Sequence, residues 1–208
     1  MKLAFVTIAL GTAAPSMAAQ ITFEGLNGFG ETEIPDGYSG LNWDNLYSLT
    51  ASNFASSGYP ASVVSGSNIA FNGFGAPASF SSATPFTLNS GYFTAAFNDG
   101  LTVNVSGFIG AALTYSKVFQ VNTSGPSLET FGWAGLTNVV LTSVGGTPRA
   151  GFGGSGTNFA LDDLMINAPV STGAVPEPIT WTMMMIGFGA VGFAMRRQRN
   201  VTTTVRFV

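Results

Sequence analysis

The segment YFTAAFNDGLTVNVSGF, residues 92–108, carries the clearest structural signal in this chain of 208 residues. Over residues 101–106 apolar and polar side chains alternate, which is the spacing of a strand with one buried face. Asp99-Gly100 stands between two such runs, and an Asp-Gly pair in that position favours a tight hairpin turn. The segment therefore predicts that Tyr92–Phe97 and Leu101–Phe108 pair as antiparallel strands.

Similar alternation recurs on both sides of this segment. It is found at Ile21–Glu24, Phe119–Asn122 and Phe159–Asp162, and no apolar spacing of a helical kind persists for long. The 27 Gly residues suit turns, and the 18 Phe residues suit a pleated, half-buried surface. Roughly ten short strands at this spacing are typical of a sandwich. We therefore predict that residues 20–167 form a mainly β domain, an antiparallel jelly-roll β-sandwich.

Charge and missing residue types exclude several functions. Between Gln20 and Val170 nine acidic residues stand against two basic ones, a balance of −7. Such a domain lacks the basic surface that a phosphate backbone requires, so nucleic acid is excluded as a partner. The chain has no Cys and no His, which removes disulfides, thiolate metal sites and nucleophiles activated by His. A glycosidase with paired carboxylates needs neither residue, although no spacing selects a pair.

Residues 1–19, MKLAFVTIALGTAAPSMAA, have the three parts of a secretory signal peptide. Lys2 supplies the positive charge, Leu3–Leu10 the apolar segment, and Ser16 and Ala18 the small-x-small cleavage pattern. Cleavage after Ala18 fits best, and cleavage one residue later is the alternative. The segment predicts export by the secretion machinery and removal by signal peptidase.

On the other side of the domain, the seventeen residues 179–195 carry no charge, and Arg196, Arg197 and Arg199 follow. As a helix this run would be about 26 Å long, near the short limit for the core of a bilayer. The basic cluster would stay cytoplasmic, which places the β domain outside. We predict a single transmembrane helix at 179–195. The remaining segments are a linker of small residues at 168–175 and a short tail at 200–208.

The stretch 176–199 resembles the PEP-CTERM sorting signal in its PEPxxWA variant. The tripeptide Pro176-Glu177-Pro178, an apolar span with Trp181 and the basic cluster stand in the required order. Thr182 departs from the variant, in which Ala usually follows the Trp. The two prolines should keep the tripeptide extended and outside a helix, which presents the carboxylate of Glu177 on a rigid segment.

This resemblance implies a substrate of an exosortase, a membrane enzyme that acts near the tripeptide. Such proteins occur in Gram-negative bacteria that make exopolysaccharide or biofilm matrix. The resemblance implies a precursor held transiently in the inner membrane, then a place at the cell surface or in the extracellular matrix. The sorting residues that it implies are Pro176, Glu177, Pro178, Trp181, Arg196, Arg197 and Arg199.

The run Asn158–Ile166 resembles the last strand of jelly-roll carbohydrate-binding domains, and Ile21–Gly25 is similar to their first strand. In such domains the two strands lie side by side, and an acid from each can hold a structural calcium. The resemblance implies Glu24 and Asp162 as ligands, with Asp163 as the spare. Carboxylates are hard oxygen ligands that suit calcium. Because neighbouring strand residues point to opposite faces, only one of the two aspartates should face such a site, and the alternative is that both solvate a sheet edge.

The Gly-punctuated stretch 35–45 gathers aromatic, amide and acidic side chains. Aromatic faces stack on sugars, while amides and carboxylates bind hydroxyls. We therefore expect a carbohydrate site. Its candidate residues are Tyr38, Asn42, Trp43, Asp44 and Tyr59. For Trp43 taken alone, a place in the core is the favoured alternative.

Three functions stay open. The leading hypothesis is a non-catalytic surface or matrix protein that binds exopolysaccharide through its β-sandwich. A purely structural or adhesive module is the alternative, and a glycosidase with paired carboxylates is the third.

Overall fold

A computed structural model of the chain describes residues 18–26, 30–167, 178–197 and 206. The chain divides into two units, Met1–Pro169 and Val170–Val208, and each is described by itself. The described residues leave out 1–17 of the predicted signal peptide, the predicted linker and nearly all of the predicted tail.

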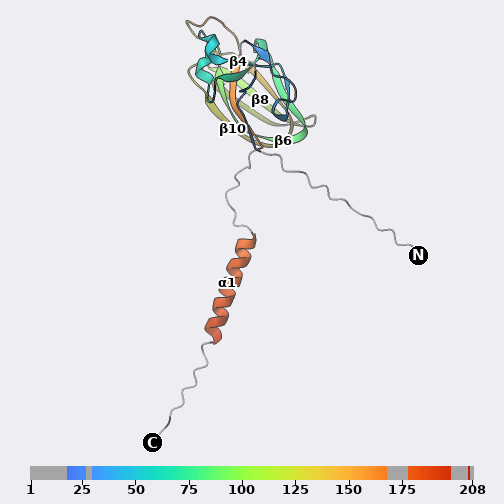
Figure 1. Cartoon of the computed structure of the whole chain (residues 1–208), viewed down its shortest axis with the longest axis vertical. Coiled ribbons are helices and arrows are strands. Elements are labelled where there is room, and N and C mark those ends of the chain that lie inside the picture. Colours follow the sequence, from blue (N-terminus) through green and yellow to red (C-terminus); the bar gives the residue numbers. More distant parts are fainter. Residues whose placement is uncertain (1–17, 27–29, 168–177, 198–205, 207–208) are drawn as a thin grey trace, which may run out of the picture. The chain divides into compact units, whose positions relative to one another are not determined.

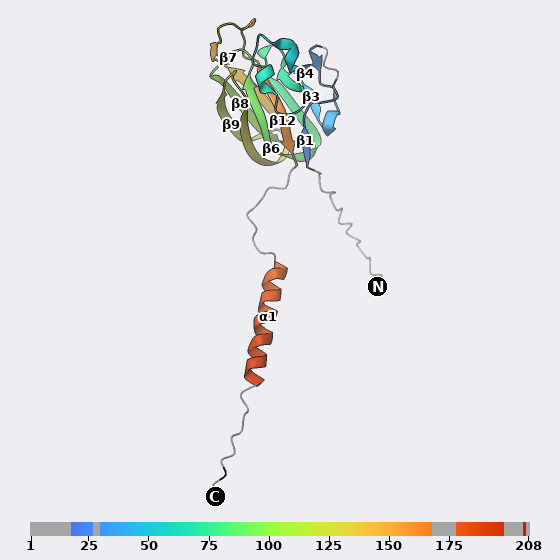
Figure 2. The same cartoon turned by 60° about the vertical axis from the view of Figure 1, so that its left-hand side comes forward.

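The first unit is mainly β, with every paired strand antiparallel to its neighbour, as the sequence predicts (Figures 1 and 2). Within the described residues, ten strands form one sheet in the order β2-β4-β5-β12-β6-β10-β8-β9, with β1 added beside β12 and β3 beside β6. A separate ribbon pairs β7 with β11. The strands are β1 (Ala19–Ile21), β2 (Thr32–Glu33), β3 (Asn42–Asp44), β4 (Leu46–Thr50), β5 (Asn68–Asn72), β6 (Ala78–Ala95), β7 (Asn98–Asp99), β8 (Leu101–Ile109), β9 (Ala112–Val121), β10 (Ser127–Val144), β11 (Thr147–Pro148) and β12 (Phe159–Ile166). The short 3₁₀ turns in the described part of the chain are η1 (Tyr38–Gly40), η2 (Ala51–Phe54), η3 (Pro60–Ser62) and η4 (Gly73–Gly75).

The two longest strands, β6 and β10, hold this sheet together. Each has 18 residues, and register shifts in their shared ladder allow them to bend. β10 lies between β6 and β8 and pairs with both, while β6 also pairs with β12 and β3. The sheet thereby encloses a core that includes Phe80, Phe93, Leu136 and Phe159, each at most 1% exposed. Along β8 the predicted alternation is present, since every second residue from Leu101 to Gly107 is buried.

The hairpin predicted at Asp99-Gly100 is wrong. Both flanking strands exist, but β10 lies between β6 and β8 in the sheet. Asp99 instead joins the ribbon with β11, and its Oδ1 accepts hydrogen bonds from the backbone N (2.8 Å) and the hydroxyl (2.7 Å) of Thr123. Gly100 has the positive φ of 70° that a tight turn requires. The turn residues are thus where the sequence indicates, while the strand pairing is different.

The first and last strands of the domain lie side by side, as predicted. Ala19 of β1 stands opposite Ile166 of β12, and Ile21 stands opposite Leu164. Ala19 is therefore part of the sheet, although the predicted signal peptide includes it.

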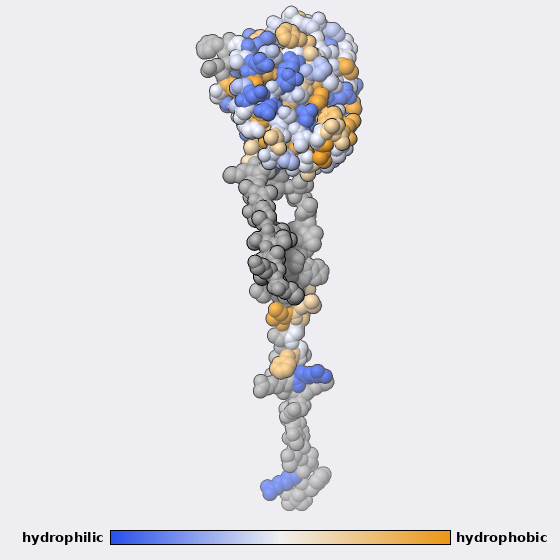
Figure 3. Space-filling view, turned by 90° about the vertical axis from the view of Figure 1, so that its right-hand side faces the viewer, coloured by the Kyte–Doolittle hydropathy of each residue, from blue (hydrophilic) through white to orange (hydrophobic). Residues whose placement is uncertain are grey.

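The second unit contains α1 (Pro178–Arg197), which covers the helix predicted at 179–195. Pro178 is its first residue, so the prediction that this proline stays outside a helix is wrong. Proline is well tolerated there because the N–H that it lacks would have no partner within the helix. The apolar side chains described on α1 are exposed (Figure 3). Met185 is 74% exposed and Phe193 is 72% exposed. Among the residues that the structure describes, no helix has the length and apolar character needed to cross a membrane.

Candidate functional site

Most of the predicted carbohydrate-binding residues lie on η1 and β3, but the ring of Trp43 is covered. It is 6% exposed and contacts Phe23 and Phe80, with ring centroids 5.9 and 5.5 Å apart. Its Nε1 donates a hydrogen bond of 2.9 Å to the carbonyl oxygen of Tyr38, whose own ring packs against it. Trp43 is therefore a core residue, which is the alternative that the sequence favours for it.

The polar residues beside Trp43 do not form a closed site around it. Asn42 and Asp44 are exposed at the two ends of β3. Tyr38 is half-buried, and burial raises the pKa of its hydroxyl. The fifth predicted residue, Tyr59, lines a different cavity.

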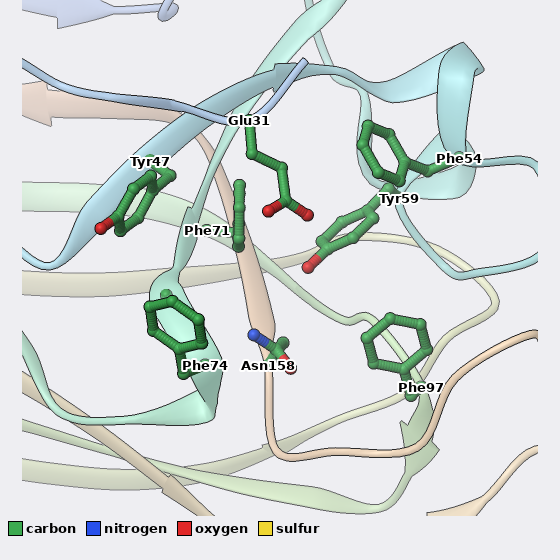
Figure 4. A pocket seen from close by; sticks show the side chains of 9 residues that line it. Glu31, Tyr47, Phe54, Tyr59, Phe71, Phe74, Phe97 and Asn158 are labelled. Carbon is green, nitrogen blue, oxygen red and sulfur yellow. The ribbon is translucent and has the colours of Figure 1, made fainter.

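That cavity, here called the aromatic pocket, has a volume of about 230 Å³. Six of its side chains are aromatic. They come from β4, η2, the N-cap of η3, β5, η4 and the turn between β6 and β7. Figure 4 shows these rings arranged around the carboxylate of Glu31. The lining residues are Glu31, Tyr47, Phe54, Tyr59, Phe71, Gly73, Phe74, Phe97 and Asn158. Apart from Tyr59, sequence reasoning missed all of them, because they are spread over more than a hundred residues.

Tyr59 forms the centre of the aromatic pocket. It is 2% exposed, and its ring centroid lies 5.5 Å from that of Phe71 and 5.9 Å from those of Phe54 and Phe97. Burial, with a smaller contribution from the nearby carboxylate of Glu31, raises the pKa of Tyr59 well above its usual value. The tyrosine is thus a neutral hydroxyl with a polar end directed into the pocket (Figure 4).

Phe74 is the exposed ring of the pocket. Its side chain is 93% exposed, and its backbone has φ 57° and ψ 15°, in the left-handed region. Its ring contacts that of Tyr47 edge-on, with centroids 6.5 Å apart. A phenylalanine that is both strained and exposed contributes little to folding, and such residues cluster at binding sites.

Local sequence explains how Phe74 is held. The side-chain amide of Asn45 donates hydrogen bonds to the carbonyl oxygens of Gly73 (3.1 Å) and Pro77 (2.9 Å), and the backbone carbonyl oxygen of Asn45 accepts one from the Gly73 N–H (3.0 Å). A Cβ on Gly73 would lie 2.5 Å from both Asn45 and the Tyr47 ring, so only glycine fits there. The Gly-Phe-Gly turn is therefore clamped at both ends.

A second cavity of about 520 Å³ adjoins the aromatic pocket and shares Glu31, Phe54 and Phe97 with it. Its far wall includes Gly153, whose N–H donates a 2.9 Å hydrogen bond to the carbonyl oxygen of Ser56. Together the two cavities form a groove longer than either one. Of the described residues that line this groove, Glu31 is the one that carries a charge.

The three carboxylates predicted to bind calcium converge on one loop, residues 64–68. Glu24 Oε1 accepts hydrogen bonds from the backbone N–H groups of Ser67 (2.8 Å) and Asn68 (2.6 Å). Its carboxylate therefore fastens the loop to the segment that follows β1.

Asp162 and Asp163 fasten the same loop from β12. Asp162 Oδ2 accepts from the N–H groups of Val64 (2.7 Å) and Ser65 (3.1 Å), and Asp163 Oδ1 accepts from the Ser65 hydroxyl (2.6 Å). The prediction that these aspartates face opposite sides is wrong, because Asp163 has a φ of 48° in a bulge of the strand. Burial raises the pKa of Asp162 to about 6. Within the described residues, no three acidic, His or Cys side chains form a group able to hold a metal ion.

The predicted sorting residues fall partly on α1. Pro178 and Trp181 lie in its first turn, and Arg196 and Arg197 in its last, with Arg196 exposed. The others, Pro176, Glu177 and Arg199, lie outside the described residues.

Comparison with known proteins identifies the C-terminal motif. The family model of the PEP-CTERM protein-sorting motif matches residues 174–199, so the chain carries this motif where the sequence predicts it. No curated protein matches the chain in sequence.

Three solved structures are similar to the chain in fold. A DUF4465 family protein from Bacteroides caccae ATCC 43185 is 13% identical, with 77% of this chain and 97% of that chain covered and a TM-score of 0.48. Another from Bacteroides ovatus ATCC 8483 is also 13% identical, with 74% and 89% covered and a TM-score of 0.42. TmCBM61, solved in complex with β-1,4-galactotriose, is 11% identical, with 64% and 93% covered and a TM-score of 0.35. At these values the likeness does not extend to ligands or activity.

Proposed function

We propose that the protein is exported, sorted by an exosortase and placed at the cell surface or in the extracellular matrix, where its β domain binds exopolysaccharide. The sorting motif at 174–199 supports the first half. The strained, exposed ring of Phe74 over the aromatic pocket carries the second half. In this proposal the sheet is a jelly-roll sandwich, and the protein is not an enzyme.

The chemistry of the groove supports a sugar ligand. Aromatic faces pack against the C–H surfaces of a sugar, and Phe74 and Tyr47 offer such faces at the rim. The Glu31 carboxylate and the Tyr59 hydroxyl can bind sugar hydroxyls from below. Because the second cavity continues the first, a chain of several sugar units suits the groove better than a single sugar.

A binding role fits the groove better than hydrolysis. Glycosidases of the common kind need two carboxylates that flank the scissile bond. Among the described lining residues of both cavities, Glu31 is the one carboxylate. The groove therefore lacks the second acid that this mechanism uses.

Binding of the purified full chain to matrix polysaccharide and to a glycan array tests the ligand half. Phe74→Ala should weaken binding at least tenfold, about 1.4 kcal/mol, with the melting temperature unchanged. Leu113→Ala is the matched control, since Leu113 is 59% exposed on β9 and does not line the groove. Absence of binding to every glycan would refute the carbohydrate role and favour the structural or adhesive module.

A further inference from the structure

We propose that the aromatic pocket binds an organic ammonium group, so that the polysaccharide it recognises carries protonated amines, as a de-N-acetylated hexosamine unit does. This inference rests on the proposed function, because it names the class of glycan for the same site. It is carried by the six rings and the single carboxylate that line the pocket.

The lining is suited to a cation. The faces of aromatic rings attract ammonium groups, and cages of several rings are used to bind them. In the aromatic pocket, Glu31 adds a full negative charge beside the rings of Tyr59 and Phe71 (Figure 4). An anionic sugar would be repelled by that charge, whereas a neutral sugar would leave it without a counter-charge.

The same domain already contains an ammonium group bound in this manner. The Nζ of Lys117 lies 5.7 Å from the ring centroid of Phe119 and 5.2 Å from that of Phe131. It also forms an ion pair of 2.7 Å with Glu129. Two rings and one carboxylate thus lie around the ammonium group of Lys117 on β9. The aromatic pocket also combines rings with one carboxylate, but its described lining includes no basic side chain.

No basic side chain in the described part of the β domain supplies that cation. Lys117 is engaged with Glu129, and Arg149 donates to the Thr123 hydroxyl (2.8 Å) and lies 4.0 Å from Asp99. Among the described residues no ion pair includes Glu31. Glu31 is exposed, so its carboxylate is accessible to a cationic ligand.

The groove also sets how such a ligand lies. The ammonium-bearing unit would occupy the aromatic pocket, with Phe74 against the sugar ring. Neighbouring units would extend into the second cavity past Phe54 and Phe97, which both cavities share.

Titration calorimetry on the full chain at pH 5.5 tests this with four probes. They are a glucosamine hexamer, the fully N-acetylated hexamer of the same backbone, a glucose hexamer with the same linkage, and choline. The glucosamine hexamer should bind at least tenfold more tightly than the other two oligomers. Glu31→Gln should abolish that preference, and Glu33→Gln should keep it. Glu33 is the matched control because it is exposed on β2, close in sequence, and does not line the groove.

The outcomes separate this inference from the proposed function. Equal or tighter binding of the neutral oligomers overturns the ammonium proposal and leaves carbohydrate binding standing. If Glu33→Gln also abolishes the preference for the glucosamine hexamer, the ammonium proposal is overturned as well. The overall negative charge of the domain would then explain the binding. Choline binding that Glu31→Gln removes, without binding of any oligomer, supports the ammonium site and refutes the glycan. No binding of any probe refutes the ammonium proposal, while the glycan array decides the carbohydrate role separately.

Discussion

Replacing Phe74 with glycine is expected to stabilise the protein and to weaken ligand binding. The left-handed backbone of Phe74, with φ 57°, costs a non-glycine residue about 1–2 kcal/mol. Glycine relieves that strain but loses about 0.5–1 kcal/mol through the greater freedom of the unfolded chain. Because the ring is 93% exposed, its removal forfeits little packing. The net gain is about 0.5–1 kcal/mol, which raises the melting temperature by about 1–4 °C in a chain of this size.

Differential scanning calorimetry and glycan titration on the same preparations measure both effects. Phe74→Ala separates them, since alanine removes the ring but keeps the strained backbone, so its melting temperature should stay near that of the wild type. Both variants should bind at least tenfold more weakly. A fall of more than about 2 °C for Phe74→Gly would show that the ring stabilises the fold. Unchanged affinity in both variants would refute its role in binding.

Three further predictions concern the fold. Burial raises the pKa of Asp162 from 3.8 to about 6, so its contribution to stability is fully present below about pH 4 and is lost as the pH rises through 6. Asp162→Asn should remove this slope, worth up to about 3 kcal/mol, in urea unfolding at pH 4 and pH 7. Gly58→Ala should cost about 2–3 kcal/mol, because its Cβ would lie 2.2 Å from the Ala95 carbonyl oxygen, while Gly125→Ala, with open space, should be harmless in the same assay. Trp43→Ala should cost about 3–5 kcal/mol as a core truncation, and a selective loss of glycan affinity at unchanged stability would contradict its placement.

Local pattern was sufficient for the class of fold and for the sorting motif. Alternation along Leu101–Ser106 specifies which side chains are buried, because the period of a strand is two residues. The motif at 174–199 is a contiguous stretch, so it can be recognised without any tertiary contact. The pairing of the first and last strands could be expected because Ile21–Gly25 and Asn158–Ile166 resemble the terminal strands of jelly-roll domains.

The sequence by itself determined that the chain forms antiparallel strands and carries a sorting motif, since both depend on neighbouring residues. Tertiary structure decided which strands pair, because the alternation that buries Leu101 does not state whether β6 or β10 lies beside it. It also decided the candidate site, because Glu31, Phe74 and Asn158 line one pocket only when folding brings three distant segments together. Tertiary structure also decided the direction of the Asp163 side chain. The left-handed backbone at Asp163 turns its carboxylate away from the face that simple alternation along a strand would give it.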